Sequence, residues 1–479
     1  MDTSPTAHIP LPKLTKMIYG AGDIGLASWG TLRQIFYAIF LTDVVGIEAR
    51  LASVAALIAV LWDAINDPLV GMISDRVETR WGRRRPFLLV FSIPFGLAFL
   101  LMWWAPPWEN KRLLALHVLC AYLISDTLQT LVSVPFYTLT PEMTPDYDER
   151  TELTTYRMFF NLVASLVVAV SAPMIRTAAV QAGLTTQQSY LLIAGLFGLL
   201  GMVPFIPLFF VVRERHPQPV KKSPSLAEIF QTAWDNIPFR FVTGLYMLNC
   251  MTVDLVALML PYFISYWIAR GNLTAEISVF GENIALESII LGLMFTTAIA
   301  SLPFWNWISA KTSKRKAYMA GMSFWMVVQL LIITLQPGQI PLILLLTMLA
   351  GISISTAHVL PEANFPDLLE WEELRTRRRH EGVYYGTKNF LRKLSGAVAI
   401  FFSLQVLGWF GYQSPPQGAA TFQQPPVAVQ AIRILTGPFG ALLLFSSVIL
   451  AWFYPLTREK HDRIRMLLSR RQNRAEAEC

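Results

Sequence analysis

Charged residues are scarce in this chain of 479 residues, because Asp, Glu, Lys and Arg together make up 15% of it. A soluble domain carries about a quarter charged residues, and 54% of the present sequence is hydrophobic. The core of a soluble protein could not bury that much apolar surface. The composition therefore excludes an ordinary soluble protein and predicts that lipid surrounds most of the chain.

Cysteine is also rare, and the three residues are Cys120, Cys250 and Cys479. Their positions indicate neither a disulfide framework nor a metal-binding motif. The six histidines are scattered, without the spacing of a metalloprotease, and no Gly-x-Ser-x-Gly sequence is present. We therefore expect that the protein is not an enzyme and has no cofactor.

Apolar runs of about 20 residues, long enough to cross the hydrocarbon of a bilayer, recur along the whole chain. The first residues show no cleavable signal pattern, so the first run is expected to serve also as the targeting signal. An even number of spans places both termini on one side of the membrane. The twelve expected spans are residues 17–42, 50–74, 86–105, 113–139, 154–177, 188–212, 238–268, 284–309, 317–336, 339–360, 382–411 and 430–455.

The net charge of +7 follows from membrane topology. Most Lys and Arg residues fall in loops on the face that carries the termini, and such loops stay in the cytoplasm. We therefore expect an integral protein of the plasma (inner) membrane with cytoplasmic termini. The expected partners are the lipid bilayer and a small molecule, with no nucleic acid, and we expect a monomer.

Internal repetition divides the chain into two halves. A basic cluster follows the second span of each half, and Pro141-Glu142 is echoed by Pro361-Glu362. Duplicated halves are common among membrane transporters. We expect an all-α membrane protein with twelve transmembrane helices in two pseudo-symmetric six-helix halves. The expected parts are residues 1–212, a cytoplasmic linker at 213–237, the second half at 238–455 and a basic cytoplasmic tail at 456–479.

Ionisable residues within the spans are informative, because a charge in hydrocarbon is costly and usually faces a cavity or a partner. Asp63 and Asp67 stand four residues apart, which places both carboxylates on one helix face. Asn66 adds a neutral oxygen on nearly the same face, and oxygen donors suit a hard cation such as Na⁺. Alternatively one carboxyl group takes a proton, because burial and a like charge favour the neutral form.

Two further residues belong to this predicted Na⁺ or H⁺ site. Pro68 has no N–H group, so it leaves a backbone carbonyl of the preceding turn as a further potential ligand. Lys393, in the eleventh span, is the natural counter-charge of the carboxylates. The alternative interpretation is a carboxylate pair that a buried basic residue neutralises for structural reasons alone.

The loop after the second span is rich in charge and resembles the signature loop between helices 2 and 3 of the major facilitator superfamily. In that superfamily the loop clamps the two halves together on the cytoplasmic side. A cluster of this kind is also typical of a positive-inside topology signal. The predicted gating residues, in this loop and in two later ones, are Asp75, Arg83, Arg84, Arg85, Arg150, Glu373 and Arg379.

Several short motifs in both halves share their order and spacing with one transporter family. They include the strings from Trp62 to Pro68, from Val134 to Tyr137 and from Tyr156 to Phe160. On these motifs the chain resembles the glycoside–pentoside–hexuronide:cation symporters. The resemblance implies a cation site at Asp63 and Asp67 with Lys393 close by, and a central solute cavity that works by alternating access.

The resemblance leaves the transported solute open. Galactoside permeases of this family have carboxylates where this chain has Ala27 and Ser133, which argues against a galactoside. A different glycoside, a uronate or a solute with a charged head group would suit the ionisable residues near the expected cavity. The expected substrate-binding residues are Asp23, Asp126, Ser133, Tyr137, Arg157, His358 and Lys388.

The sequence thus predicts a secondary active transporter that couples Na⁺ or H⁺ to the symport of a glycoside-like or related organic solute. One alternative is a symporter of lysophospholipids or other amphiphiles, which the same family contains. A second alternative is an uncoupled sensor or scramblase with this fold. The presence of Asp63, Asp67 and Lys393 together argues against the uncoupled protein.

Overall fold

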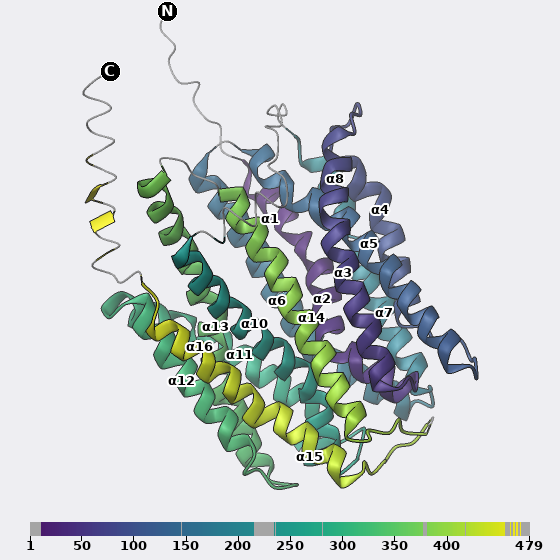
Figure 1. The fold of residues 1–479 in the computed structure, drawn as a ribbon. Coiled ribbons are helices and arrows are strands. Elements are labelled where there is room, and N and C mark those ends of the chain that lie inside the picture. Colours follow the sequence, from purple (N-terminus) through teal and green to yellow (C-terminus); the bar gives the residue numbers. More distant parts are fainter. Residues whose placement is uncertain are drawn as a thin grey trace, which may run out of the picture. The chain divides into compact units, whose positions relative to one another are not determined.

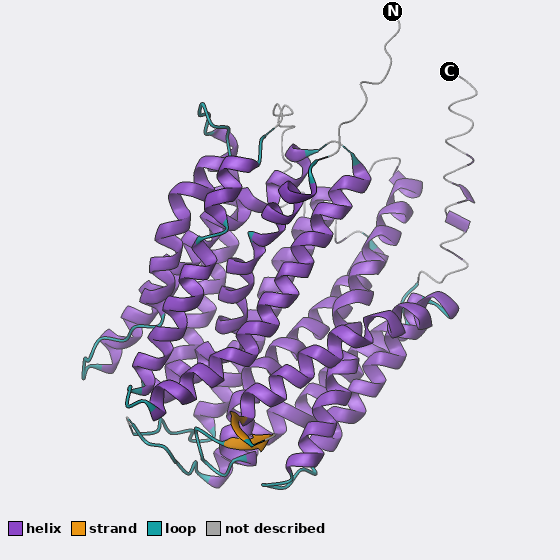
Figure 2. Cartoon of the chain, turned by 180° about the vertical axis from the view of Figure 1, so that it is seen from behind, coloured by secondary structure: helices purple, strands orange, loops and turns teal. Residues whose placement is uncertain are grey.

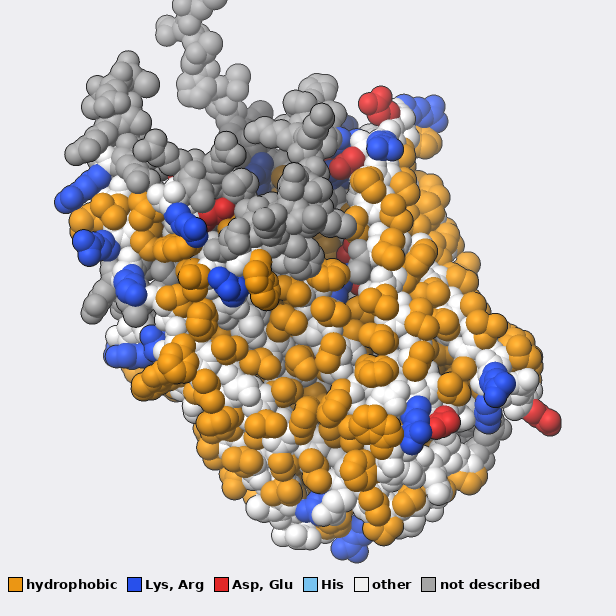
Figure 3. All heavy atoms as spheres, viewed as in Figure 1, with side chains coloured by type: hydrophobic (Ala, Val, Ile, Leu, Met, Phe, Trp, Pro, Cys, Tyr) orange, Lys and Arg blue, Asp and Glu red, His pale blue; other side chains and the backbone are white. Residues whose placement is uncertain are grey.

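The computed structural model describes residues 11–144, 146–214, 236–279, 281–376, 381–416 and 418–455, with Trp234 and isolated residues between 460 and 470. Helices make up most of this part of the chain (Figure 1). Hydrophobic side chains cover most of the visible face in Figure 3, where charged side chains lie mainly toward the edges. The structure is therefore that of an all-α membrane protein.

Eleven helical stretches among the described residues are long and apolar enough to cross a membrane. Each coincides with an expected span. The remaining expected span, 317–336, coincides with α12 (Lys314–Ile332), which begins with three basic residues and is less apolar. The eleven stretches are Lys13–Val44, Ala49–Arg76, Arg85–Met102, Lys111–Met143, Glu149–Gln181, Thr186–Val211, Ile237–Ile268, Leu286–Lys311, Ile340–Ala357, Thr387–Trp409 and Pro426–Trp452.

Internal contacts divide the chain into two compact units. The first unit comprises Met1–Val220, Glu276–Ser288 and Ser414–Ala419, and the second comprises Lys221–Ala275, Ile289–Gln413 and Ala420–Cys479. Two short segments from the later part of the sequence thus belong to the first unit. The helices of the first unit are α1 (Lys13–Ala21), α2 (Asp23–Ile39), η1 (Phe40–Val44), α3 (Ala49–Arg76), α4 (Arg85–Met102), α5 (Lys111–Met143), α6 (Tyr147–Gln181), α7 (Thr186–Met202) and α8 (Phe205–Val211).

Polar caps fix where several of these helices begin. The Asn110 side chain accepts hydrogen bonds from the backbone N–H groups of Arg112 and Leu113 at the start of α5. Thr185 and Gln188 form a capping box at the start of α7. Such caps satisfy N–H groups that have no partner within the helix. The helix starts therefore lie at the polar residues that interrupt the apolar runs.

The second unit contains α10 (Ile237–Tyr262), η2 (Phe263–Ile268), most of α11 (Leu286–Lys311), α12, α13 (Ile340–Thr376), α14 (Glu381–Trp409), α15 (Pro426–Ile434), η3 (Leu435–Phe439) and α16 (Gly440–Trp452). α13 continues well past the expected end of its span at residue 360. Buried Leu368 and the partly buried Trp371 and Leu374 pack in a hydrophobic cluster with Phe239 and Tyr384. This packing stabilises the helix beyond residue 360, where the sequence alone predicted a loop.

A β-hairpin is the second difference from the expected structure (Figure 2). β1 (Glu276–Val279) pairs antiparallel with β2 (Glu282–Ala285), and Val279 faces Glu282. Gly281 in the connecting turn has a φ of +90°, a conformation that glycine adopts without steric cost. The eighth span was expected to begin at residue 284, whereas α11 begins at Leu286 because the preceding residues are paired in the hairpin.

Close backbone packing joins α2 to α7. A Cβ atom on Gly25 would lie 2.5 Å from the carbonyl oxygen of Gly201 and 2.6 Å from its Cα atom. These are backbone atoms, which cannot rotate away. Only glycine at position 25 therefore permits this approach of the two helices.

We expect Gly25→Ala to destabilise the first unit, because α2 and α7 would have to separate. Overpacking of this kind costs about 1–3 kcal/mol. Gly30→Ala on the same helix is the matched control, since a Cβ atom there meets nothing within 4 Å. Thermal unfolding of the detergent-purified protein should show a lower Tm for Gly25→Ala alone, and equal Tm values would contradict the packing argument.

Candidate functional site

Three of the predicted cation-site residues lie on α3 in the first unit, where α3 packs against α5. Asp63 and Asp67 are half-buried on α3, and Asn66 is only 4% exposed. The hydroxyl group of Thr130 on α5 donates a hydrogen bond to Oδ1 of Asp67 at 3.3 Å. Thr130 thus brings a further oxygen to the carboxylates, and the sequence prediction did not include it.

Asn66 has a buried polar atom that is consistent with its predicted role as a cation ligand. Its amide nitrogen is buried and has no hydrogen-bond partner among the described residues. The oxygen and nitrogen of an amide exchange places when the group turns over, so either atom can occupy the buried position. If the amide oxygen occupies the buried position, Asn66 offers a neutral ligand directly before Asp67 in the sequence.

α3 runs without a break through Pro68. Because proline has no N–H group, the carbonyl oxygen one turn earlier receives no hydrogen bond from it. The nearby indole of Trp62 donates to the hydroxyl oxygen of Thr127 at 2.9 Å, and this contact fixes α3 against α5. The helix therefore continues past Pro68 while one carbonyl remains available as a ligand.

The donor set fits a hard monovalent cation. Carboxylate, amide, hydroxyl and carbonyl oxygens suit such ions, whereas imidazole and thiolate suit transition metals. The described part of the chain contains no group of three or more His, Cys, Asp or Glu side chains that could hold a metal ion. These oxygen donors are therefore compatible with Na⁺ or with a proton.

A second charged cluster lies beside these carboxylates. Nη1 of Arg33, on α2, is 3.9 Å from Oδ1 of buried Asp126 on α5 and donates a hydrogen bond to the hydroxyl oxygen of Tyr122. Its guanidinium group stacks 4.2 Å from the ring centre of Trp29. Asp126 was predicted to bind substrate, and the structure places it with Arg33 instead of with Asp23.

Three of the predicted substrate residues do come together. Nε of Arg157, on α6, lies 3.1 Å from Oδ2 of Asp23 on α2, and the Tyr137 hydroxyl group donates to Oδ1 of Asp23 at 3.4 Å. The Arg157 guanidinium group is 4.3 Å from the ring centre of Tyr137. A carboxylate, a guanidinium group and an aromatic ring thus form one cluster, with Asp23 fully buried.

The other predicted substrate residues lie elsewhere. Ser133 is buried on α5, one turn before Tyr137. Lys388 is buried on α14 in the second unit, with its ammonium group 5.1 Å from the ring centre of Tyr246. His358 belongs to the part of α13 whose side chains are outside the described structure. The shared solute cavity therefore stays a prediction for these three residues.

The second unit has a partly buried ion pair of its own. Arg392 on α14 makes two hydrogen bonds to Asp254 on α10, of 2.5 and 3.0 Å. A Cβ atom on Gly396 would lie 2.7 Å from Oδ2 of Asp254, so glycine makes room for the pair. Lys393 follows Arg392 on α14, and its predicted role beside Asp63 stays a prediction.

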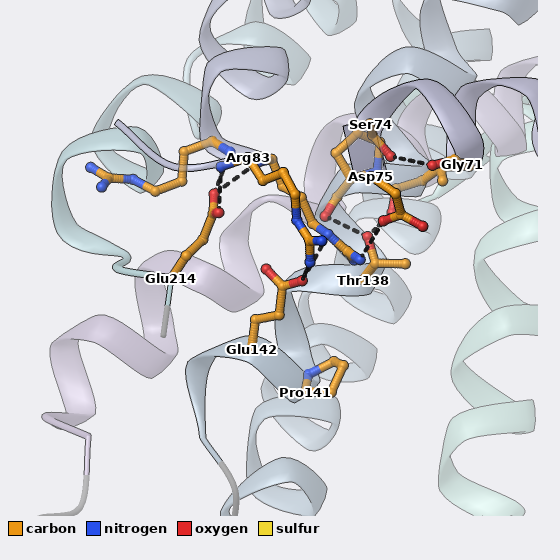
Figure 4. Close-up of polar contacts among 12 residues, drawn as sticks. Gly71, Ser74, Asp75, Arg83, Thr138, Pro141, Glu142 and Glu214 are labelled. Carbon is orange, nitrogen blue, oxygen red and sulfur yellow. Dashed lines mark hydrogen bonds and ion pairs between the residues drawn. The ribbon is translucent and has the colours of Figure 1, made fainter. Parts of the chain in front are cut away.

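The charged loop between α3 and α4 is held by carboxylates of its own unit (Figure 4). Glu142 at the end of α5 contacts Arg83 at 2.7 Å and Arg84 at 3.0 Å, and Arg84 also contacts Asp75 at 2.9 Å. Glu214 accepts hydrogen bonds from the backbone N–H groups of residues 83, 84 and 85. A carboxylate is favoured at this position because it lies at a helix N-terminus.

The remaining predicted gating residues differ in their surroundings. Arg85 donates to the carbonyl oxygen of Phe209, and Arg150 donates to the carbonyl oxygen of Thr144 at 2.9 Å. Glu373 is half-buried on α13, and Arg379 lies outside the described residues. Sequence reasoning missed the roles of Glu142 and Glu214. The echo of Pro141-Glu142 in the second half was the available signal for Glu142.

Comparison with known proteins agrees with this architecture. A family model described as MFS/sugar transport protein matches residues 18–458. The uncharacterized symporter sll1374 of Synechocystis sp. is 30% identical over 96% of this chain and 97% of its own. The putative glycoside/cation symporter YagG of Escherichia coli is 26% identical, with 96% of each chain covered.

Two further comparisons extend this relationship. The sodium-dependent lysophosphatidylcholine symporter 1-A of Danio rerio is 25% identical over 94% of this chain and 86% of its own. Among solved structures, a bacterial homologue of the human drug peptide transporters PepT1 and PepT2 has a TM-score of 0.63 at 13% identity, with 96% and 100% of the chains covered. At this identity the structural likeness shows the fold alone.

The fold and the relatives together define a membrane transporter of the major facilitator superfamily and not an enzyme. The chain belongs to the MFS/sugar transport protein family, and it is a cation-coupled symporter. The predicted resemblance, the all-α membrane fold and the class of activity are confirmed. The number of twelve spans stays a prediction.

We expect the Asp23–Arg157 pair to be a stability determinant of the first unit. Removing one member of a buried pair leaves an uncompensated charge, which costs about 3–5 kcal/mol. Asp23→Asn and Arg157→Gln should each lower the Tm. The double variant should lose less than the sum of the two losses, because no lone charge remains. Additive losses in thermal unfolding would show that the two side chains act independently.

Proposed function

We propose that the protein is a Na⁺-coupled symporter that binds its cation at Asp63, Asn66, Asp67 and Thr130. The observation that carries the proposal is the contact of Thr130 with Asp67, since it adds a neutral oxygen to a pair of carboxylates one helical turn apart. Two carboxylates at this spacing repel each other, and a bound cation removes the repulsion. H⁺ coupling at the same carboxylates is the alternative outcome.

The proposed solute is glycoside-like or a related organic molecule with a polar or charged group. Support comes from the cluster of Asp23, Tyr137 and Arg157, because a carboxylate and a guanidinium group bind hydroxyl or carboxylate groups while an aromatic ring packs against a sugar face. The name of the Escherichia coli relative points to the same class of solute. Ser133, one turn from Tyr137, is a further proposed contact.

A zwitterionic amphiphile is the second candidate solute. Asp23 and Arg157 carry opposite charges 3.1 Å apart, so their partners could be the ammonium and phosphate groups of one head group. The name of the Danio rerio relative, a lysophosphatidylcholine symporter, favours the same class. The two candidates differ in their need for an acyl chain.

We propose that transport proceeds by alternating access in the plasma (inner) membrane, with both termini in the cytoplasm and the protein acting as a monomer. The basic residues of the loops and tail support this orientation, since Lys and Arg collect on the cytoplasmic side. In the proposed cycle, the cation binds first, the solute follows, and the loaded protein opens inward. The charged loop at Arg83 and Arg84 would break and re-form its contacts as a gate.

Thr130→Val should weaken Na⁺ binding while the fold is retained, because valine keeps the shape of threonine and lacks its oxygen. The loss of one hydrogen-bonding ligand is worth about 0.5–1.5 kcal/mol, so the Na⁺ concentration for half-maximal uptake should rise about two- to tenfold. Asp63→Asn should abolish the Na⁺ dependence. Uptake into proteoliposomes with and without a Na⁺ gradient measures both effects.

The control for this experiment is Thr296→Val on α11, since the Thr296 hydroxyl group is exposed and donates to carbonyl groups of its own helix. It should behave like the wild type. A Thr130→Val protein with unchanged Na⁺ dependence would remove Thr130 from the site. Uptake that follows a proton gradient and ignores Na⁺ would replace Na⁺ by H⁺ in the proposal.

A thermal-shift screen should identify the solute class. Glycosides, uronates and lysolipids are each added with Na⁺ and with choline as the control cation. A true substrate should raise the Tm more in Na⁺ than in choline, because the two ligands bind one state together. Stabilisation by lysolipids alone would establish the second candidate, and stabilisation by none of the three classes would contradict both.

A further inference from the structure

We infer that Arg33 and Asp126 form a charge-balancing pair that sets the affinity of the neighbouring carboxylates Asp63 and Asp67 for the coupling cation. The inference rests on the proposed cation site and adds two residues to it. Neither residue supplies a ligand in this assignment. Both act through their charges, so they are positioning residues.

The first argument is the way in which Arg33 is held. Its guanidinium group is fixed by stacking on Trp29, by the hydroxyl group of Tyr122 and by the carboxylate of Asp126. The indole of Trp29 in turn donates a hydrogen bond to the Ser125 hydroxyl oxygen at 3.1 Å. These contacts come from two helices, and they keep a permanent positive charge at one place inside the unit.

The second argument is the position of this charge. Asp126, Thr127 and Thr130 lie on neighbouring turns of α5, and the two threonines contact Trp62 and Asp67 on α3. Asp63 lies close enough to Arg33 for their opposite charges to attract each other. The Arg33 cluster and the proposed cation site are therefore adjacent parts of one interface between helices.

The third argument is the balance of charge. Asp126 and Asp63 are two carboxylates near the guanidinium group of Arg33, and Asp67 lies one helical turn after Asp63. The Asp126 side chain is only 2% exposed, whereas that of Arg33 is 34% exposed, so little water screens Asp126. Arg33 repels a bound cation and Asp126 attracts it, and in the wild type these two effects oppose each other.

The test is a double-mutant cycle on the full-length protein in nanodiscs, with Na⁺ affinity measured by equilibrium binding of radiolabelled Na⁺. Alkaline pH keeps the carboxylates ionised. Arg33→Gln should lower the Kd for Na⁺ about tenfold, and Asp126→Asn should raise it by a similar factor, as expected for a unit charge within roughly 10 Å in a protein. The double variant should return to within about threefold of the wild type, because the two charges cancel.

Three further variants separate charge from folding. Arg33→Lys keeps the positive charge and should stay close to the wild-type affinity. Arg50→Gln on α3 removes an exposed positive charge that is paired with Glu48, and it should leave the affinity unchanged. The Tm in the absence of Na⁺ identifies any variant that has merely lost its fold, and the opposite signs of the two single variants cannot arise from unfolding.

The possible failures are distinguishable. If the wild type binds Na⁺ and Asp63→Asn abolishes binding, the proposed site stands. In that case, Arg33→Gln and Asp126→Asn variants that leave the Kd unchanged, or shift it in the same direction, overturn the charge-balancing role alone. If the wild type binds no Na⁺, or Asp63→Asn binds it normally, the proposed site and the role of Arg33 both fall.

Discussion

The structure depends on one constraint, which is that an ionised side chain in hydrocarbon must be compensated where it lies. In the first unit Asp23 is paired with Arg157, and in the second unit Asp254 is paired with Arg392. Each pair joins the first long helix of its unit to the fifth. Duplicated halves would be expected to place such an ion pair at corresponding helices. Each pair also joins the start of its unit to a segment more than 130 residues later in the sequence.

Asp67 on α3 differs from the carboxylates of these ion pairs, because a described neighbour that contacts it is a neutral hydroxyl group. The hydrogen bond to Asp67 comes from a threonine hydroxyl group, which can turn its hydrogen away and offer a lone pair to a cation instead. An arginine cannot make that change. A hydroxyl neighbour is therefore compatible with a cation that binds and leaves.

Sequence patterns predicted the helical spans well, because each span is an apolar run between polar caps such as Asn110 and Thr185. They also predicted Asp63 and Asp67 as neighbours, since spacing along one helix fixes that geometry. They did not predict Thr130, Glu142 or Glu214, whose roles depend on which helices pack together. The extension of α13 was missed for the same reason: its stability comes from buried Leu368 in a cluster built from several helices.

α5 connects the proposed cation site to the charged cluster around Asp23. Thr130 contacts Asp67 on α3, and seven residues later Tyr137 contacts Asp23 on α2. The backbone oxygen of Phe136 accepts a hydrogen bond from Tyr19 at 3.1 Å, so the same part of α5 is also held to α1. A rotation or shift of α5 would therefore alter the contacts that Tyr137 makes with Asp23 and Arg157. Coupling between two ligands requires one element whose position both of them affect, and α5 contacts residues of both proposed sites within a single unit.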